Sequence, residues 1–204
     1  MSIIYPLSPP TARGPRGVTI RARSAVGMSV SPFTFSQQVY VHQGEMWELD
    51  VEIPPVRRSD AEEWVAFLLA LNGREGTFLM GDPVNISPRG NWSGAATVNG
   101  AGQLGKVLNI HGLAAGATGR SGDWFQLGTG ASSTLHKLTL NFTASGAGAA
   151  TINFWPRLRR SPPHNAPIIT SSPRGLWRLA GDIREWSMDL AAVYGIKFAA
   201  IEAL

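Results

Sequence analysis

Residues 38–53, QVYVHQGEMWELDVEI, end in a regular alternation of apolar and acidic side chains. Four apolar positions alternate with three acidic ones: Trp47, Leu49, Val51 and Ile53 with Glu48, Asp50 and Glu52. Successive side chains of a strand point to opposite faces, so one face should lie on a core and the other should be acidic. Gly44 stands where a turn would fall, and this predicts a β-hairpin over residues 38–53.

The residues that follow predict an α-helix. Pro54–Pro55 ends the strand, because proline can continue neither a strand nor a helix ladder. In SDAEEWVAFLLALNG, Ser59 and Glu62 have the spacing of a capping box, and Gly73 follows as a C-terminal stop. Four apolar side chains lie on one stripe at helical spacing, namely Trp64, Phe67, Leu68 and Leu71. GTFLMGDP then indicates a short strand.

The composition changes near residue 85. Residues 85–155 contain 13 of the 23 glycines and only five charged side chains. Glycine-rich turns separate short β-like pieces, KVLNI, DWFQL, HKLTLNF and ATINFW. Leu138, Leu140 and Phe142 alternate as if they shared a buried face, which argues against a low-complexity loop. We therefore predict a compact all-β insertion.

The C-terminal part returns to the earlier pattern. WSMDL at 186–190 repeats the apolar spacing of WELDV at 47–51. We expect two further strands, with a turn near Tyr194–Gly195, that pair with the N-terminal hairpin. The predicted fold is mainly β (α+β), with an antiparallel sheet or barrel, one packed helix and an inserted small all-β domain. The expected organisation is a main domain with an N-terminal arm over 1–84, the insertion over 85–155, and a connector with the C-terminal strands over 156–204.

Charge is distributed in alternating blocks around a formal net charge of +4. Residues 1–36 and 156–178 contain arginines and no acid, whereas residues 45–63 contain seven acids and two arginines. A DNA-binding protein usually presents one dominant basic face. Alternating blocks suit charges that meet one another, within a subunit or between subunits. An ordinary solvated surface is the alternative.

The sequence offers no convincing catalytic or cofactor site. Without cysteine there is no thiol chemistry. GAGQLGK has the spacing of a phosphate-binding loop, but Val107 replaces the magnesium-binding Ser or Thr, so a β-turn linker is expected. The four histidines lack metal-ligand spacing, and Asp123 is the only carboxylate of the insertion. We expect no catalytic residue, cofactor or metal. No apolar run approaches the roughly 18 residues of a membrane span.

The stretch INFWPRLRRSPPHNAP, residues 152–167, combines aromatics, arginines and prolines. A single-stranded nucleic-acid site would interleave aromatics and cations, but here the aromatics precede the arginines. The prolines stiffen the chain into an extended connector. We predict a structural joint whose arginines meet the acidic hairpin face across a subunit boundary: Arg157, Arg159 and Arg160 with Glu48, Asp50 and Glu52.

Three tryptophans, Trp92, Trp124 and Trp155, lie in or beside the insertion. They could form a platform on which sugars stack, but tryptophan is also an effective core and interface anchor. The core or interface interpretation is favoured. Trp92 and Trp124 are the candidate surface-binding aromatics of the alternative function, a carbohydrate-binding adhesion module for attachment to a host surface.

A series of short motifs runs through residues 31–83. They are S-P-x-T, then Q, G-x-x-W, paired prolines, an A-x-x-W-x-A-F-L-like helix, L-x-G, G-x-F and D-P. Their carriers are Ser31, Pro32, Thr34, Gln38, Gly44, Trp47, Pro54, Pro55, the helix 59–71, Gly73, Gly76, Phe78, Asp82 and Pro83. Together with GDWFQLG, WPRLR and FAAIEA, this pattern resembles structural tail proteins of long-tailed bacteriophages, of the distal tail or tail-tip hub class.

The resemblance implies a non-enzymatic structural protein of the virion, made in the host cytoplasm. Such a protein would form a homo-oligomeric ring, a hexamer or a trimer, joining the tail tube to the tail tip. Its partners would be copies of itself and other tail tube and tail-tip proteins, without specific nucleic acid or membrane insertion. Members of this class often carry an inserted domain, and residues 85–155 would project from the hub domain in this way.

Overall fold

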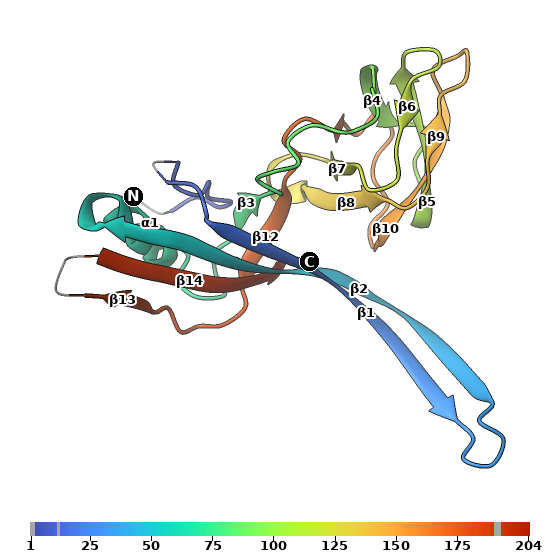
Figure 1. Cartoon of the computed structure of the whole chain (residues 1–204). Coiled ribbons are helices and arrows are strands. Elements are labelled where there is room, and N and C mark those ends of the chain that lie inside the picture. Colours follow the sequence, from blue (N-terminus) through green and yellow to red (C-terminus); the bar gives the residue numbers. More distant parts are fainter. Residues whose placement is uncertain (1–2, 12, 190–192) are drawn as a thin grey trace.

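The computed structural model describes residues 3–11, 13–189 and 193–204. In these ranges the chain is mainly β, with one α-helix and two six-stranded antiparallel sheets (Figure 1). The predicted fold class is therefore confirmed. There are two hydrophobic clusters, and the one on the first sheet also includes Trp124 and Leu135 from the second. A long two-stranded ribbon extends away from both sheets.

The first sheet has the strand order β1-β2-β14-β12-β3, and β13 pairs with β14 outside this path. Its strands are β1 (Gly17–Val30), β2 (Gln37–Arg57), β3 (Phe78–Met80), β12 (Gly175–Leu179), β13 (Trp186–Met188) and β14 (Val193–Glu202). The alternation predicted from sequence lies on β2. Its four apolar side chains are all buried: Trp47, Leu49, Val51 and Ile53. This sheet and the helix form the body of the molecule.

Helix α1 (Arg58–Ala70) packs on the body sheet, as its apolar stripe predicts. The four predicted stripe residues are buried: Trp64, Phe67, Leu68 and Leu71. The predicted capping box is wrong. Strand β2 continues directly to Arg57, which is the N-cap, so Ser59 lies inside the first turn. Its hydroxyl donates to Asp60 at 3.2 Å, and the side chain of the N-cap residue Arg57 forms no capping hydrogen bond.

The predicted hairpin over residues 38–53 is wrong, because these residues form one strand that pairs with another part of the chain. Strand β2 passes straight through Gly44 and pairs with β1, and the turn lies at 31–36. The pairing register shifts between Ser24 and Val26, next to Gly44, where an added Cβ would lie 3.1 Å from that of Ala25. Gly44 thus marks a β-bulge, a position that glycine favours as much as a turn.

The two predicted C-terminal strands are present as β13 and β14, and β14 pairs with β2. The turn predicted near Tyr194–Gly195 is misplaced, because both residues lie in β14, where Gly195 faces Ser187. Strands β13 and β14 are antiparallel, and residues 190–192 between them lie outside the described residues.

The second sheet has the order β11-β7-β8-β10-β5-β4. Its strands are β4 (Gly94–Val98), β5 (Gly105–Leu113), β7 (Trp124–Leu127), β8 (Thr134–Leu138), β10 (Ala150–Leu158) and β11 (Ile168–Ile169). The amide of Val98 donates to the carbonyl of Ala166 at 3.0 Å, which brings β4 back toward β11, so the sheet nearly closes into a barrel. A two-stranded sheet of β6 (Thr118–Gly119) and β9 (Phe142–Thr143) and the short 3-10 helix η1 (Gly130–Ser132) complete this unit.

The core of the second unit differs from expectation in one detail. Leu138 and Phe142 are buried, but Leu140 is 58% exposed. The three do not share a face, because β8 ends at Leu138 and β9 begins only at Phe142. The cluster also includes Ile168, beyond residue 155. The division into domains at 85 and 155 stays a prediction about independent folding.

Candidate functional site

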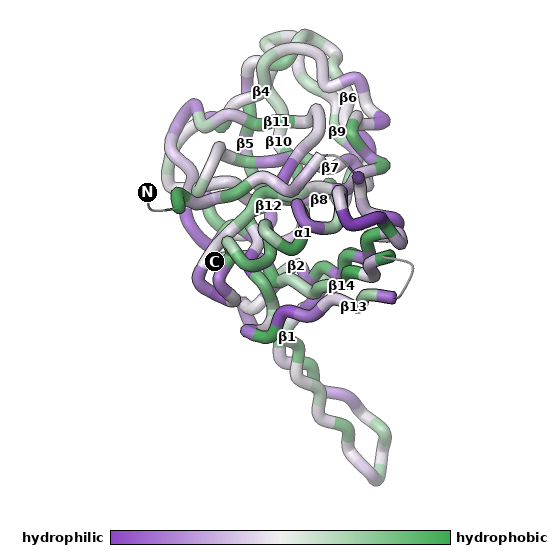
Figure 2. The backbone as a smooth tube through the Cα atoms, turned by 90° about the vertical axis from the view of Figure 1, so that its left-hand side faces the viewer, coloured by the Kyte–Doolittle hydropathy of each residue, from purple (hydrophilic) through white to green (hydrophobic). Residues whose placement is uncertain are grey.

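The two-stranded ribbon formed by residues 25–43 is the most unusual surface of the molecule. We call it the β-arm. Strand β14 pairs with β2 only as far as Glu48, and beyond this point β1 and β2 pair only with each other in the described structure. Figures 1 and 2 show the β-arm extending well away from the body.

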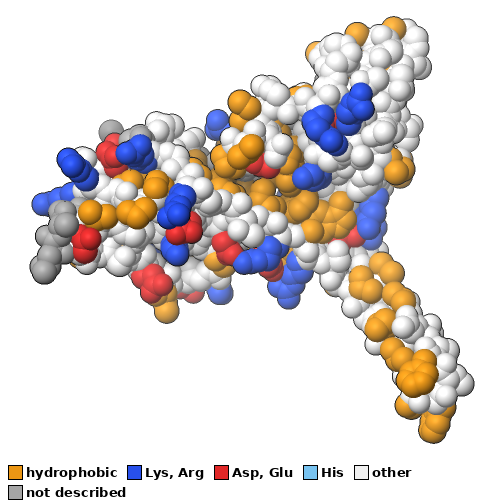
Figure 3. Space-filling model, in the orientation of Figure 1, with side chains coloured by type: hydrophobic (Ala, Val, Ile, Leu, Met, Phe, Trp, Pro, Cys, Tyr) orange, Lys and Arg blue, Asp and Glu red, His pale blue; other side chains and the backbone are white. Residues whose placement is uncertain are grey.

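The β-arm is apolar and uncharged. Residues 24–44 contain no Lys, Arg, Asp or Glu. Phe33 and Phe35, at the tip, are 91% and 76% exposed. In all, eight large apolar side chains of the β-arm are exposed: Val26, Met28, Val30, Phe33, Phe35, Val39, Tyr40 and Val41. Figure 3 shows them gathered along the ribbon, whereas the body carries charged side chains over much of its visible face.

An apolar two-stranded ribbon of this kind is energetically unfavourable when it is surrounded only by water. A lone two-stranded hairpin is only marginally stable, and its two outer edges present unpaired backbone groups that can pair with another chain. Natural edges are usually protected by charged side chains, which the β-arm lacks. A large contiguous apolar patch on a protein marks an interaction surface. The β-arm therefore has the properties of an interaction surface.

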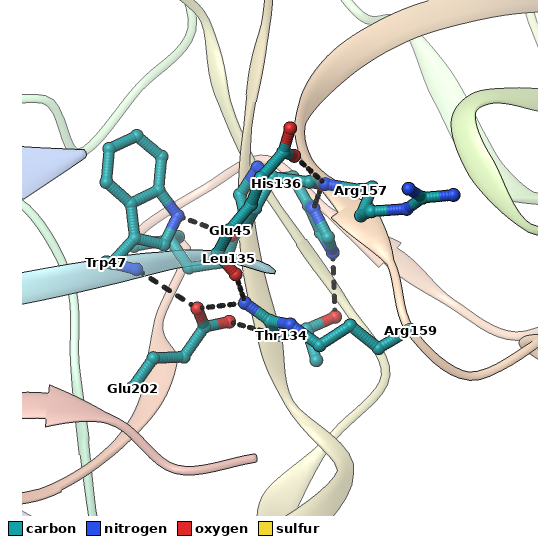
Figure 4. Close-up of polar contacts among 9 residues, drawn as sticks. Glu45, Trp47, Thr134, Leu135, His136, Arg157, Arg159 and Glu202 are labelled. Carbon is teal, nitrogen blue, oxygen red and sulfur yellow. Dashed lines mark hydrogen bonds and ion pairs between the residues drawn. The ribbon is translucent and has the colours of Figure 1, made fainter. Parts of the chain in front are cut away.

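The junction between the two units contains a buried polar network (Figure 4). Arg159 forms a bidentate pair with Glu202, with Nη1–Oε1 at 3.1 Å and Nη2–Oε2 at 2.8 Å, and it also donates to the carbonyl of Glu45. The Glu45 carboxylate accepts from the amide of Arg157 at 2.9 Å and pairs with Lys106 at 2.5 Å. Both carboxylates are almost fully buried. The network ties the connector to the base of the β-arm.

Tryptophans complete this junction. The indole of Trp47 donates to the carbonyl of Leu135 in the second unit at 2.8 Å. Its ring lies 4.2 Å from Trp155 and 4.9 Å from Trp124, centroid to centroid. The root of the β-arm is thus packed against the second unit by an aromatic cluster, and such ring contacts stabilise the place where the ribbon leaves the body.

The predicted charge partners are placed differently from expectation. The three acids of the hairpin face all have partners within the chain: Glu48 with Arg23, Asp50 with Arg21, and Glu52 with Lys197. These partners come from β1 and β14, the strands flanking β2. The predicted arginines lie at the junction instead. Their pairing with these acids across a subunit boundary stays a prediction, and it would have to displace partners already in place.

Trp92 and Trp124 are buried, at 4% and 5% exposure. The indole of Trp92 donates to Asp123 at 3.0 Å, and its ring packs edge-on against Phe142. Neither ring is available for stacking on a sugar. The structure therefore agrees with the core interpretation of these two residues and corrects their assignment as surface aromatics.

Asp123 has a structural role. Its carboxylate is buried and accepts hydrogen bonds from the amides of Arg89, Gly90 and Arg120 and from Trp92. Burial alone would raise the pKa of Asp123, but these four donors outweigh it and lower the pKa below its ordinary value. The carboxylate thus holds the loop before β4 against the loop before β7.

Two further sequence motifs, GAGQLGK and the histidines, can be located in the structure. GAGQLGK links β4 to β5, as a turn linker should. His111 and His164 stack at 5.4 Å, but no group of three or more potential metal-ligating side chains occurs within the described ranges. In the part of the chain that the structure describes, no helix has the length and apolar character to cross a membrane.

His136 provides a pH-dependent test of the junction. It is buried, its two ring nitrogens contact the carbonyl of Pro156 and the hydroxyl of Thr134, both at 2.9 Å, and burial lowers its pKa to about 4. The unfolded chain takes up this proton near the ordinary pKa of 6.5. The contribution of neutral His136 to the free energy of unfolding is therefore fully present above pH 6.5. It decreases by about 3 kcal/mol in total as the pH falls toward 4.

We expect urea unfolding of the wild type to show this loss between pH 7 and pH 4.5. A His136→Gln variant cannot titrate there, so its stability should depend less on pH. The carboxylates are common to both proteins and cancel in the comparison. Parallel stability curves for the two proteins would contradict the assignment.

Comparison with known proteins gives no family for this chain. No protein-family model matches it, and no curated protein matches it significantly.

Proposed function

We propose that this protein is a non-enzymatic structural component of a bacteriophage tail. In this role it is a distal tail or tail-tip hub protein that forms a homo-oligomeric ring, a hexamer or a trimer, between the tail tube and the tail tip. The observation that carries the proposal is the β-arm, an uncharged apolar ribbon that a monomer would leave exposed to water.

The motifs of the resemblance support this role, because several lie on the β-arm and at its root. Ser31, Pro32 and Thr34 form the turn at its tip, where the amide of Phe35 donates to the carbonyl of Ser31 at 2.9 Å. Gly44 lies at the bulge, and Trp47 follows in the aromatic cluster at the root. The alternative of a carbohydrate-binding module relied on Trp92 and Trp124, which are buried.

Removal of the β-arm should abolish assembly while the body stays folded. We suggest replacing residues 26–42 by an Asn-Gly turn, because the contacts of the β-arm in the described structure are almost entirely internal to it. Native mass spectrometry should show a ring for the wild type and a monomer for the truncated protein, with similar circular dichroism spectra.

A milder variant tests the tip alone. Phe33→Ser with Phe35→Ser should weaken the ring at least tenfold in its dissociation constant, since two exposed aromatics lose their burial. Ile183→Ser is the matched control, because this side chain is 89% exposed but lies outside the β-arm. A ring that survives removal of the β-arm, or a wild type that is monomeric at every concentration, would refute the proposal.

A further inference from the structure

A hollow of about 480 Å³ opens where the second unit meets the body. Its walls come from three places in the sequence: residues 127–134 of the second unit, residues 157–163 of the connector, and β12 with the C-terminal residues. We call it the arginine pocket. It lies beside the junction network, and Arg159 belongs to both.

Four arginines line the arginine pocket, Arg157, Arg159, Arg160 and Arg178, and no acidic side chain is among its described lining residues. Arg159 is neutralised by Glu202, and Arg178 donates to the carbonyl of Arg74. Arg157 and Arg160 have no carboxylate within 4.0 Å in the described ranges. Two guanidinium groups therefore remain available at a concave surface.

The rest of the lining is apolar and hydroxyl-bearing. Leu127, Leu158 and Leu176 contribute apolar surface, and Thr129 and Ser132 contribute hydroxyls. Guanidinium groups recognise carboxylates through paired N–H donors. Leucine side chains can pack against the apolar side chains of a ligand. Single-stranded nucleic acid would need exposed aromatic rings on which bases stack, and none lines the described pocket. The combination fits a peptide that carries both acidic and apolar side chains.

The backbone of the connector is conformationally restricted where it lines the arginine pocket, and this favours binding there. Pro162, Pro163 and Pro167 line the pocket and restrict the connector that carries the free arginines. The amide of Arg157 is held by the buried carboxylate of Glu45. Because the backbone is already ordered, binding costs less conformational entropy than it would on a flexible loop.

We propose that the arginine pocket binds a segment of a partner protein that carries acidic and apolar side chains. The inference builds on the proposed tail function, in which the partner is a neighbouring tail protein. Binding itself requires only the pocket, so the isolated chain can be tested whether or not it forms a ring.

The test uses fluorescence anisotropy with a labelled decapeptide of alternating glutamate and leucine. We expect saturable binding to the wild type and at least tenfold weaker binding to Arg157→Gln with Arg160→Gln. Arg16→Gln with Arg120→Gln makes the same change in net charge at two exposed arginines outside the pocket, and it should alter the affinity less than twofold. Ala131→Trp, which fills the pocket without changing charge, should also weaken binding at least tenfold.

Three results would overturn the inference. The first is an equal loss of peptide affinity in the pocket variant and in the charge-matched control, which would indicate non-specific electrostatic attraction. The second is equal affinity for a peptide with glutamine in place of glutamate. The third is tighter binding of a ten-nucleotide oligothymidine that competes with the peptide. The variants retain the β-arm, so failure here leaves ring formation unaffected, and a missing ring leaves peptide binding measurable.

Discussion

Truncation of Arg159 to alanine should lower the free energy of unfolding by about 3–5 kcal/mol. Its guanidinium is the bidentate partner of Glu202, whose side chain is only 3% exposed, and it also donates to the carbonyl of Glu45. Without Arg159, Glu202 keeps the amide of Trp47, at 3.2 Å, as its one remaining described donor. A buried carboxylate that loses its counter-charge is far more costly than an exposed pair that is broken.

Urea denaturation followed by circular dichroism measures this loss. Protein concentrations are kept equal because the proposed assembly would add concentration-dependent stability. Arg58→Ala is the matched control: its pair with Glu62 is exposed and should contribute less than about 1 kcal/mol. Replacing both members of the buried pair, as in Arg159→Met with Glu202→Leu, should recover most of the stability. A single Arg159→Ala variant as stable as the control would show that the network does not hold the junction.

The periodic spacing of apolar residues along the sequence predicted the central strand and the helix of the body. The alternation from Trp47 to Ile53 and the apolar stripe of α1 depend only on neighbouring residues, and both are confirmed. The glycine signal at Gly44 was ambiguous, because a turn and a bulge both favour glycine. Only the partner strand, β1, distinguishes them, and its pairing joins residues that local patterns do not relate.

The β-arm could have been found from the sequence. The uncharged run over residues 24–44 is unusual because charged segments lie on both sides of it and it contains many large apolar residues. Its exposure could not be predicted, because burial depends on where β14 ends, and β14 stops pairing with β2 at Glu48.

The sequence likewise could not predict which charged residues pair with one another. Alternating charge blocks correctly indicate that opposite charges meet, but not which ones. Glu48, Asp50 and Glu52 are paired by the strands flanking β2, whereas Glu45, also on β2, pairs with Lys106 of the second sheet. Arg159 reaches Glu202, which lies at the C-terminal end of β14. Sheet order decides these pairs, and sheet order is set by contacts distant in the chain.

Trp64→Ala should destabilise the body by about 3–5 kcal/mol. Trp64 is 1% exposed, and its ring packs against Phe67 on α1 and Phe198 on β14. Its indole donates to the carbonyl of Arg13 at 3.2 Å, so truncation opens a cavity between helix and sheet and also releases the segment before β1.

Two further variants separate these contributions. Trp64→Phe keeps most of the apolar contact but loses the hydrogen bond to Arg13, and it should cost about 1–2 kcal/mol. Leu69→Ala, on the same helix but 52% exposed, should cost less than about 1 kcal/mol. Urea denaturation at matched concentration gives all three values. If Trp64→Ala cost no more than Leu69→Ala, the apolar stripe of α1 would not be the contact that holds the helix on the sheet.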